Sequence, residues 1–145
     1  MTHRAAFAIA AMLLAAACAP SEPLTVTHAW LRPPAPGLAV AAGYFDIVNR
    51  TATPIDLVGA RTDAAASIEI HTESGDGQMM QMRQLDKVTL APQQTVSFGP
   101  GATHLMLFEF TGAASKQIPI TLLFSDGSQR TVPFDVRTLT GESSP

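Results

Sequence analysis

The stretch "IPITLLFSDGSQRTVPFDV", residues 118–136, holds two runs rich in β-branched and aromatic residues on either side of the segment "SDGSQ". Such runs favour β-strands, and Gly, Asp and Ser between them favour a turn. The same arrangement recurs along the chain, with strands expected at 24–31, 40–49, 55–60, 67–72, 78–83, 87–90, 95–98, 104–110, 118–124 and 130–136. Many short strands separated by turns predict an all-β sandwich or small barrel.

The composition is that of one globular domain. The chain has 145 residues, of which 46% are hydrophobic and 14% charged, and this balance supports a packed core. Its net charge is -3 and its pI is about 5.7. No basic surface is therefore expected for nucleic acid, and we predict no nucleic-acid partner.

The N-terminus has the pattern of an export signal. In "MTHRAAFAIAAMLLAAAC", Arg4 precedes an apolar run from Ala5 to Ala17. That run is shorter than the roughly 20 residues that span a bilayer, and it suits the core of a signal peptide. We expect a signal peptide at 1–17, a tether at 18–23, a β-sandwich domain at 24–137 and a polar tail at 138–145.

The end of the signal leaves two outcomes open. The segment "LLAAAC" resembles a bacterial lipoprotein signal, in which the cysteine is acylated and becomes the first mature residue. Ala15 stands where that pattern prefers Leu, and Ala15 and Ala17 also satisfy an ordinary small-x-small cleavage pattern. Cys18 is thus either a lipid anchor or a residue beside a plain secretion site. Both outcomes predict a periplasmic protein, which is membrane-anchored in the first case.

Cys18 is the only cysteine. The mature domain therefore has no internal disulfide and no thiolate metal ligand. This excludes a cysteine-based zinc site, an iron–sulfur cluster and a cysteine nucleophile. A blue-copper electron-transfer protein is an alternative that we do not expect, because its site requires a cysteine with two histidines. No nucleophile motif such as G-x-S-x-G occurs, and we do not expect an enzyme.

Histidine and methionine supply the remaining metal ligands of the mature chain: His28, His71, His104, Met79, Met80, Met82 and Met106. In "THLML", His104 and Met106 are two residues apart on one expected strand, so they share a face. In "SIEIHT", Ile68 and Ile70 occupy one face and His71 the other. The short segment "ESGDG" joins this strand to the methionine cluster, which predicts that His71 lies near those methionines.

Two imidazoles and two thioethers form a coherent ligand set. Thioether sulfur is soft and selects copper(I) over zinc, calcium or magnesium, and imidazole binds as the neutral ring. The alternative is that the methionines only fill gaps in the core. Strand alternation over 78–83 predicts that Met80 and Met82 share a side while Met79 opposes them.

These residues carry a family resemblance. The sequence resembles the periplasmic copper chaperones associated with assembly of the copper-A centre of cytochrome c oxidase. Their hallmark is a histidine, ten residues, a methionine, twenty-one residues, and then H-x-M. This spacing is matched by His71, Met82, His104 and Met106. The segments "AWLRPPAPGLAVAAGYFDIVN", "GQMMQMR", "FGPGATHLML" and "ITLLFSDG" extend the resemblance over most of residues 24–136.

The resemblance implies a cupredoxin-like Greek-key β-sandwich. It also implies a monomeric copper(I) carrier with the ligands His71, Met82, His104 and Met106. The implied partner is a copper-accepting protein, the copper-A subunit of cytochrome c oxidase. Copper storage or buffering is an alternative role, and an immunoglobulin-like structural module without metal is another.

The chain departs from the family pattern in several places, including Thr72 and Glu73, which stand where many relatives have Glu-Met or similar after the first histidine. His28 stands where an acidic residue often precedes A-W, and Ala102 replaces the second glycine of the loop before His104. The tail from Thr138 to Pro145 lacks the His and Met residues that bind copper(II) in some members. We expect no copper(II) site there, and we expect His28 to be an ordinary polar histidine rather than an added ligand.

Overall fold

The computed structural model of the protein describes residues 22–137, with the exception of 76 and 78. The expected signal peptide, Cys18, most of the tether and the tail at 138–145 lie outside the described residues. Within the described part of the chain there is no helix, and so none that could cross a membrane.

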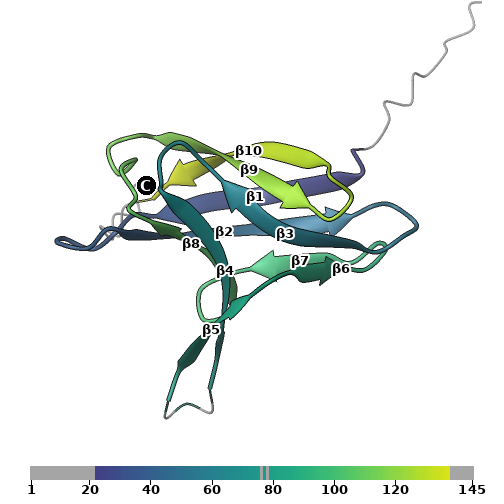
Figure 1. The fold of residues 1–145 in the computed structure, drawn as a ribbon, viewed down its shortest axis with the longest axis horizontal. Coiled ribbons are helices and arrows are strands. Elements are labelled where there is room, and N and C mark those ends of the chain that lie inside the picture. The colour runs from purple at the N-terminus through teal and green to yellow at the C-terminus, as the bar shows by residue number, and fades with distance from the viewer. Residues whose placement is uncertain (1–21, 76, 78, 138–145) are drawn as a thin grey trace, which may run out of the picture.

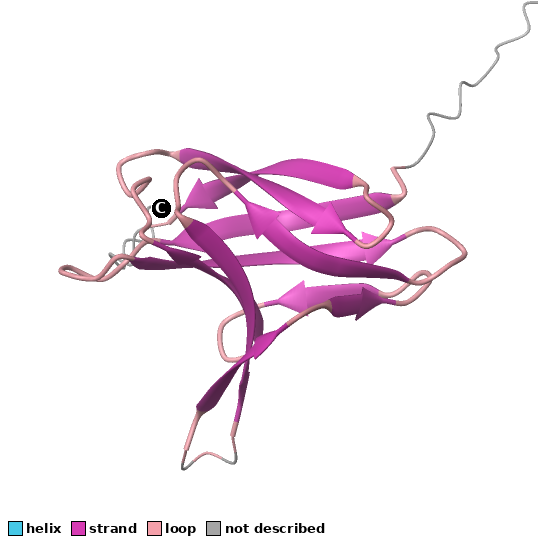
Figure 2. Ribbon diagram, viewed as in Figure 1, coloured by secondary structure: helices cyan, strands magenta, loops and turns pink. Residues whose placement is uncertain are grey.

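The described residues form ten β-strands (Figures 1 and 2). They are β1 (Leu24–Arg32), β2 (Val40–Asn49), β3 (Ile55–Arg61), β4 (Ser67–Ser74), β5 (Gln81–Leu85), β6 (Val88–Leu90), β7 (Thr95–Phe98), β8 (Thr103–Phe108), β9 (Gln117–Phe124) and β10 (Gln129–Val136). Nine of them lie within two residues of the expected bounds. The exception is β5, which begins three residues later than expected.

The strands form one continuous sheet in the order β5-β4-β8-β2-β1-β10-β9-β3-β6, and β7 pairs with β2 beside this path. All neighbours are antiparallel except β1 and β10, which are parallel. The sheet curls so that its two halves enclose one core, as Figure 1 indicates. The prediction of an all-β, cupredoxin-like Greek-key sandwich is confirmed, and the β4–β5 hairpin extends away from its body.

The core is aliphatic and aromatic. Phe45 stacks on Phe98 with ring centroids 4.3 Å apart, and it meets Phe134 edge-on at 5.6 Å. Leu105 and Leu107 of β8 are completely buried. Burying one such side chain stabilises the fold by about 1.5–3 kcal/mol relative to leaving it in water. Alternation along β8 then directs His104 and Met106 to the outer face.

Asn49 is a fully buried polar residue at the end of β2. Its amide nitrogen donates to the carbonyl oxygens of Thr53 at 2.8 Å and Leu90 at 2.9 Å. Its side-chain oxygen accepts from the backbone N–H and the hydroxyl of Thr51. These four hydrogen bonds offset the cost of burying the amide and tie the 50–54 turn to β6.

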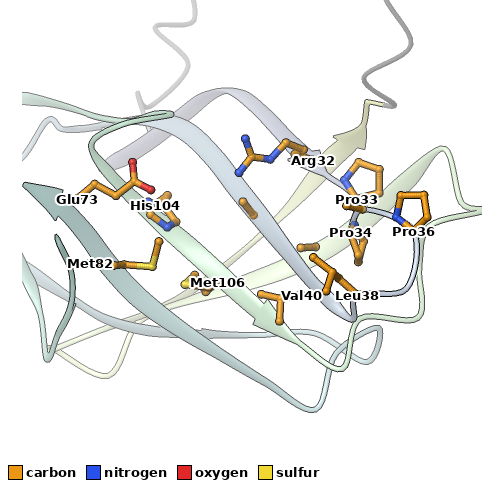
Figure 3. A pocket seen from close by; sticks show the side chains of 13 residues that line it. Arg32, Pro33, Pro34, Pro36, Leu38, Val40, Glu73, Met82, His104 and Met106 are labelled. Carbon is orange, nitrogen blue, oxygen red and sulfur yellow. The ribbon is translucent and has the colours of Figure 1, made fainter. Parts of the chain in front are cut away.

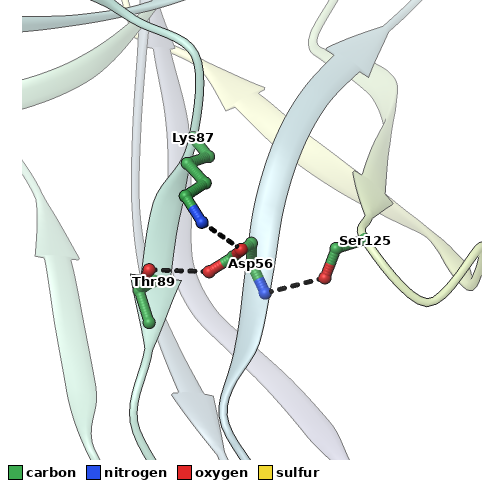
Figure 4. A network of polar contacts seen from close by, with 4 residues as sticks. All are labelled: Asp56, Lys87, Thr89 and Ser125. Atoms are coloured by element: carbon green, nitrogen blue, oxygen red, sulfur yellow. Dashed lines mark hydrogen bonds and ion pairs between the residues drawn. The ribbon is translucent and has the colours of Figure 1, made fainter.

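A second polar network joins β3 to β6 (Figure 4). The carboxylate of Asp56 accepts from Nζ of Lys87 at 2.7 Å and from the hydroxyl of Thr89 at 2.6 Å. The backbone N–H of Asp56 donates to Oγ of Ser125. The hydrogen bond from Lys87, and next that from Thr89, lower the pKa of Asp56 below its ordinary value.

A β-bulge interrupts β1 at His28 and Ala29. The register with β2 shifts between Thr27 and Trp30, and His28 has a φ of 53°. The extra residue reverses the alternation of the strand beyond it. Trp30 consequently pairs with Tyr44, and Arg32 pairs with Ala42, on the outer face of the sheet.

Candidate metal site

The four candidate ligands lie on one face of three neighbouring strands. On β4, His71 is directly opposite His104 of β8, and Glu69 is opposite Met106. On its other side β4 pairs with β5, where Glu73 is opposite Met82. Paired residues share a face, as do residues two apart on one strand. His71, Met82, His104 and Met106 therefore all face outward, away from Leu105 and Leu107.

The two imidazoles are neighbours in this arrangement. Their ring centroids are 6.4 Å apart. Nδ1 of His104 lies 3.0 Å from the carbonyl oxygen of Ala102. A carbonyl oxygen only accepts hydrogen bonds, so Nδ1 carries the proton, and Nε2 of His104 is left with its lone pair for a metal.

The ring of His71 is held from the opposite side. Its Nε2 lies 2.8 Å from Oε2 of Glu69, and an ionised carboxylate accepts the Nε2 proton. Nδ1 of His71 then carries the lone pair, yet it is buried and has no hydrogen-bond partner among the residues that the structure describes. A buried polar atom without a partner is unusual, and a bound metal would satisfy it.

A pocket of about 750 Å³ opens over this face. Figure 3 shows Met82, His104 and Met106 projecting into it together with Glu73. His71 does not line the pocket; it lies beside it as the cross-strand partner of His104. Three of the four candidate ligands therefore line one pocket. The fourth, His71, lies next to the pocket, beside the ring of His104.

Access to the candidate ligands is unequal. His104 is only 4% exposed, whereas Met82 is 49% exposed. The side chain of His71 is 14% exposed, because Phe108 and His104 of β8 lie against its ring. His104 is thus buried, and His71 is partly buried. The site opens to solvent on the side of Met82.

Aromatic rings continue the site across the sheet. Trp30 packs on Tyr44 with centroids 4.6 Å apart, and Tyr44 lies 6.2 Å from the ring of His104. The guanidinium of Arg32 sits over Tyr44, with Cζ 5.7 Å from the ring centroid. Burial raises the pKa of Tyr44 above its ordinary value; Arg32 opposes this rise, and Glu73 adds to it.

The prediction for Met79 and Met80 requires correction. Both precede β5, which begins at Gln81, so strand alternation does not assign them to opposite faces. Both side chains are exposed. A Cβ on Gly75 would clash with the carbonyl oxygen of Met79, so glycine at 75 permits a close approach that other residues would not.

His28 behaves as a polar surface residue. Its Nδ1 lies 2.8 Å from Oδ2 of Asp46, and its side chain is largely exposed. It has the surroundings of an ordinary polar histidine, and its exclusion from the ligand set stays a prediction. A hydrogen bond from Ser97, and next that from His28, lower the pKa of Asp46 below its ordinary value.

Sequence reasoning missed two residues of the site. Glu69 orients His71, and the available signal was its position two residues before His71 on one strand face. Arg32 lines the pocket, but its position depends on the bulge at His28. No residue pattern in β1 predicted that bulge.

The fold and the site define an all-β sandwich with a histidine–methionine cluster on the outer face of its sheet. Residues 24–136 match the family described as "Putative lipoprotein LpqE-like". The match covers most of the chain, and the protein belongs to this family.

One curated relative is "Putative lipoprotein Lxx21020" of Leifsonia xyli subsp. xyli. It is 29% identical over 126 residues, which cover 83% of this chain and 74% of the relative.

Solved structures share the fold. The solution structure of apo-DR1885 from Deinococcus radiodurans is 27% identical, has a TM-score of 0.61, and covers 97% of this chain and 95% of its own. The solution structure of CuI-DR1885, from the same organism, is 25% identical and has a TM-score of 0.62. It covers 86% of this chain and 83% of its own. The copper-bound PCuAC domain from PmoF2 is 24% identical and has a TM-score of 0.68. It covers 81% of this chain and 94% of its own. This last likeness concerns the fold alone.

Proposed function

We propose that the protein is an extracytoplasmic copper chaperone that binds one copper(I) ion through His71, Met82, His104 and Met106. The observation that carries the proposal is the combination of two histidines, each with one unprotonated ring nitrogen, and two methionines on one face of the sheet. Neutral nitrogen and thioether donors suit copper(I). The copper-bound form of the similar DR1885 protein supports the same cargo.

The recipient that we propose is the copper-A site of cytochrome c oxidase, and the protein acts as a monomer. The ligands of the chaperone are all neutral. The cysteine thiolates of an acceptor bind copper(I) more strongly than thioethers do. Transfer of copper(I) to a reduced dithiol is therefore thermodynamically favourable. No unfolding is needed, because Met82 is half exposed.

Titration with a competing copper(I) chelator tests the cargo. We expect one copper(I) per chain, and X-ray absorption at the copper K-edge should count both sulfur and nitrogen neighbours. Absence of stoichiometric uptake would leave an immunoglobulin-like structural module as the better account.

Mixing the copper(I)-loaded protein with the reduced, metal-free copper-A domain tests delivery. Copper should be found on the acceptor after the two proteins are separated. If copper stayed on this protein with acceptor in excess, storage or buffering would replace delivery. Deletion of the gene should lower oxidase activity most when copper is scarce, and added copper should partly restore it.

Anchoring through an acylated Cys18 is the second part of the proposal. The name of the similar Leifsonia protein, a lipoprotein, supports it. Mass spectrometry of the mature N-terminus should find a lipid on Cys18, and Cys18→Ser should release the protein from the membrane fraction. An unmodified N-terminus would establish plain secretion.

A further inference from the structure

The pocket is much larger than its cargo. Its volume of about 750 Å³ falls within the roughly 300–1,000 Å³ of sites that hold organic molecules. A single copper ion bound by side chains needs only a small part of this space. Something other than the ion fits the remainder.

The pocket has two ends that differ in chemistry (Figure 3). One end carries the donors Met82, His104 and Met106. The other end is apolar and is formed by the proline-rich segment 33–36 with Leu38 and Val40. The guanidinium of Arg32 lies between the two ends. These two ends complement an occupant with two parts. Its anionic group would reach the copper beside Arg32, and its apolar part would lie on the prolines.

The charge of Arg32 is not neutralised by an ion pair with any residue that the structure describes. Its observed contact is with the ring of Tyr44. Glu73 lines the same pocket but forms no ion pair with it among the described residues. The five N–H donors of a guanidinium are thus available to an incoming anion beside the copper ligands.

Three of the six exposed large hydrophobic residues of the described chain line the pocket, and two more lie close to one of these in the sequence. Leu38, Val40 and Met82 belong to the pocket, and Met79 and Met80 precede Met82 on the projecting hairpin. Val58 is the only other one among the described residues. Concentrated exposed apolar surface marks a protein contact, and both Met and Arg are enriched in such contacts. The exposed side chains of Met79 and Met80 do not line the pocket, so a small molecule inside it would not cover them.

From these features we infer that the pocket seats a cysteine-bearing segment of the copper-accepting protein, with Arg32 holding the incoming thiolate beside Met82 and Met106. The inference rests on the proposed function and adds the mode of transfer. The guanidinium favours the ionised sulfur, because a nearby positive charge lowers the pKa of a thiol. The apolar segment lies on the prolines and Leu38.

The transfer is a ligand exchange without oxidation or reduction. The S–H bond of the acceptor cysteine breaks, and its proton leaves to solvent. A lone pair of the thiolate forms the new copper–sulfur bond, and the bond from copper to a methionine thioether breaks. Copper stays in the +1 state throughout.

The test compares transfer rates from copper(I)-loaded Arg32→Gln and parent protein to the reduced copper-A domain. At pH 7 the variant should transfer about tenfold more slowly, which corresponds to one unit in the pKa of the incoming thiol. The gap should close as the pH rises above the thiol pKa of about 8.5, where the thiolate forms without help. Arg32→Lys should recover part of the rate, and Arg61→Gln, on β3, should match the parent.

A second variant identifies the occupant. Leu38→Gln should slow transfer to the protein acceptor but leave transfer to dithiothreitol unchanged, because the small dithiol makes no use of the apolar wall. Val58→Gln is the matched exposed control and should behave as the parent with both acceptors. Equal rates for Leu38→Gln and the parent with the protein acceptor would overturn the assignment to a protein segment.

The outcomes separate the inference from the proposed function. Arg32→Gln should retain copper at least as tightly as the parent, since it removes a positive charge near a cation. A pH-independent difference in rate, or no difference at pH 7, would overturn the role of Arg32 while uptake and delivery by the parent stand. Lack of uptake or delivery by the parent itself would instead remove the proposed function.

Discussion

The carboxylate of Glu69 accepts a hydrogen bond from Nε2 of His71, two residues further along β4, at 2.8 Å. The contact fixes the ring and leaves Nδ1 as the nitrogen with a free lone pair. Metal-binding histidines generally have such a partner on their second nitrogen, and it tunes the affinity of the site. Glu69 is therefore a positioning residue for the proposed copper site rather than a part of the solvated surface.

Replacing Glu69 by Gln should weaken copper(I) binding by about tenfold, in the range usual for such partners. The amide accepts a weaker hydrogen bond than the carboxylate and holds the His71 ring less firmly. Chelator competition measures the change. Asp86→Asn removes the same charge from the turn between β5 and β6 and should leave the affinity unchanged. A similar loss in both variants would mean that net charge, and not the position of the ring, governs binding.

Met82→Leu and Met106→Leu should each raise the dissociation constant for copper(I) by at least about tenfold, or about 1.4 kcal/mol. Leucine keeps the size and apolarity of methionine, so the fold should survive while one sulfur donor is lost. Met79→Leu is the control on the same hairpin and should bind as the parent does. The ligand assignment would be wrong if both Met82→Leu and Met106→Leu retained the affinity of the parent.

Asn49→Ala should destabilise the fold by about 2–3 kcal/mol, because it leaves the buried carbonyl of Leu90 without its donor. Urea unfolding measures the loss. Asn49 is at the opposite end of β2 from Ala42, which lines the pocket, so the folded variant should bind copper normally. A change below about 0.5 kcal/mol, the usual range for surface substitutions, would contradict the role given to this network.

Asp56→Asn should remove stability that depends on pH. The pKa of Asp56 is lowered in the folded protein by Lys87 and Thr89, so its ionised form stabilises the fold. This contribution is complete above the unfolded pKa of about 3.9 and is lost as the pH falls through the lower, folded pKa.

Urea unfolding from pH 7 to pH 2 checks this linkage. The difference between the parent and Asp56→Asn should be constant near neutrality and should shrink below pH about 4. Asp63→Asn removes an exposed acid and should show no such trend. A difference that persisted undiminished at pH 2 would mean that lost packing, and not charge, explains the effect.

Local pattern was sufficient for most of the fold. The bounds of β2 and β7 agree with the sequence expectation, because alternating apolar residues and flanking turn residues mark both ends. The strand expected at 78–83 was wrong at its start, because Met79 and Met80 precede β5 and a methionine run does not distinguish a strand from a loop. Strand order was not predictable from the chain alone.

The site was predictable in part, because strand alternation assigns each side chain to one face of the sheet. The outward face of His71 followed from Ile68 and Ile70, and Ile70 is indeed buried. The partial burial of the His71 imidazole did not follow, since it depends on β8 lying alongside β4. The orienting role of Glu69 required the rotamers of two side chains, which a sequence pattern does not specify.

The bulge at His28 places two residues of β1 opposite one residue of β2. A deletion of one of these two residues would restore regular pairing and would keep Leu31 in the core and Arg32 at the pocket. A loss of both residues would slip the register by one and exchange the environments of Leu31 and Arg32, placing a guanidinium in the core. Members of the family that retain this pocket should therefore tolerate a gap of one residue at this place but not a gap of two. The parity of this segment is a property that can be read directly from aligned sequences.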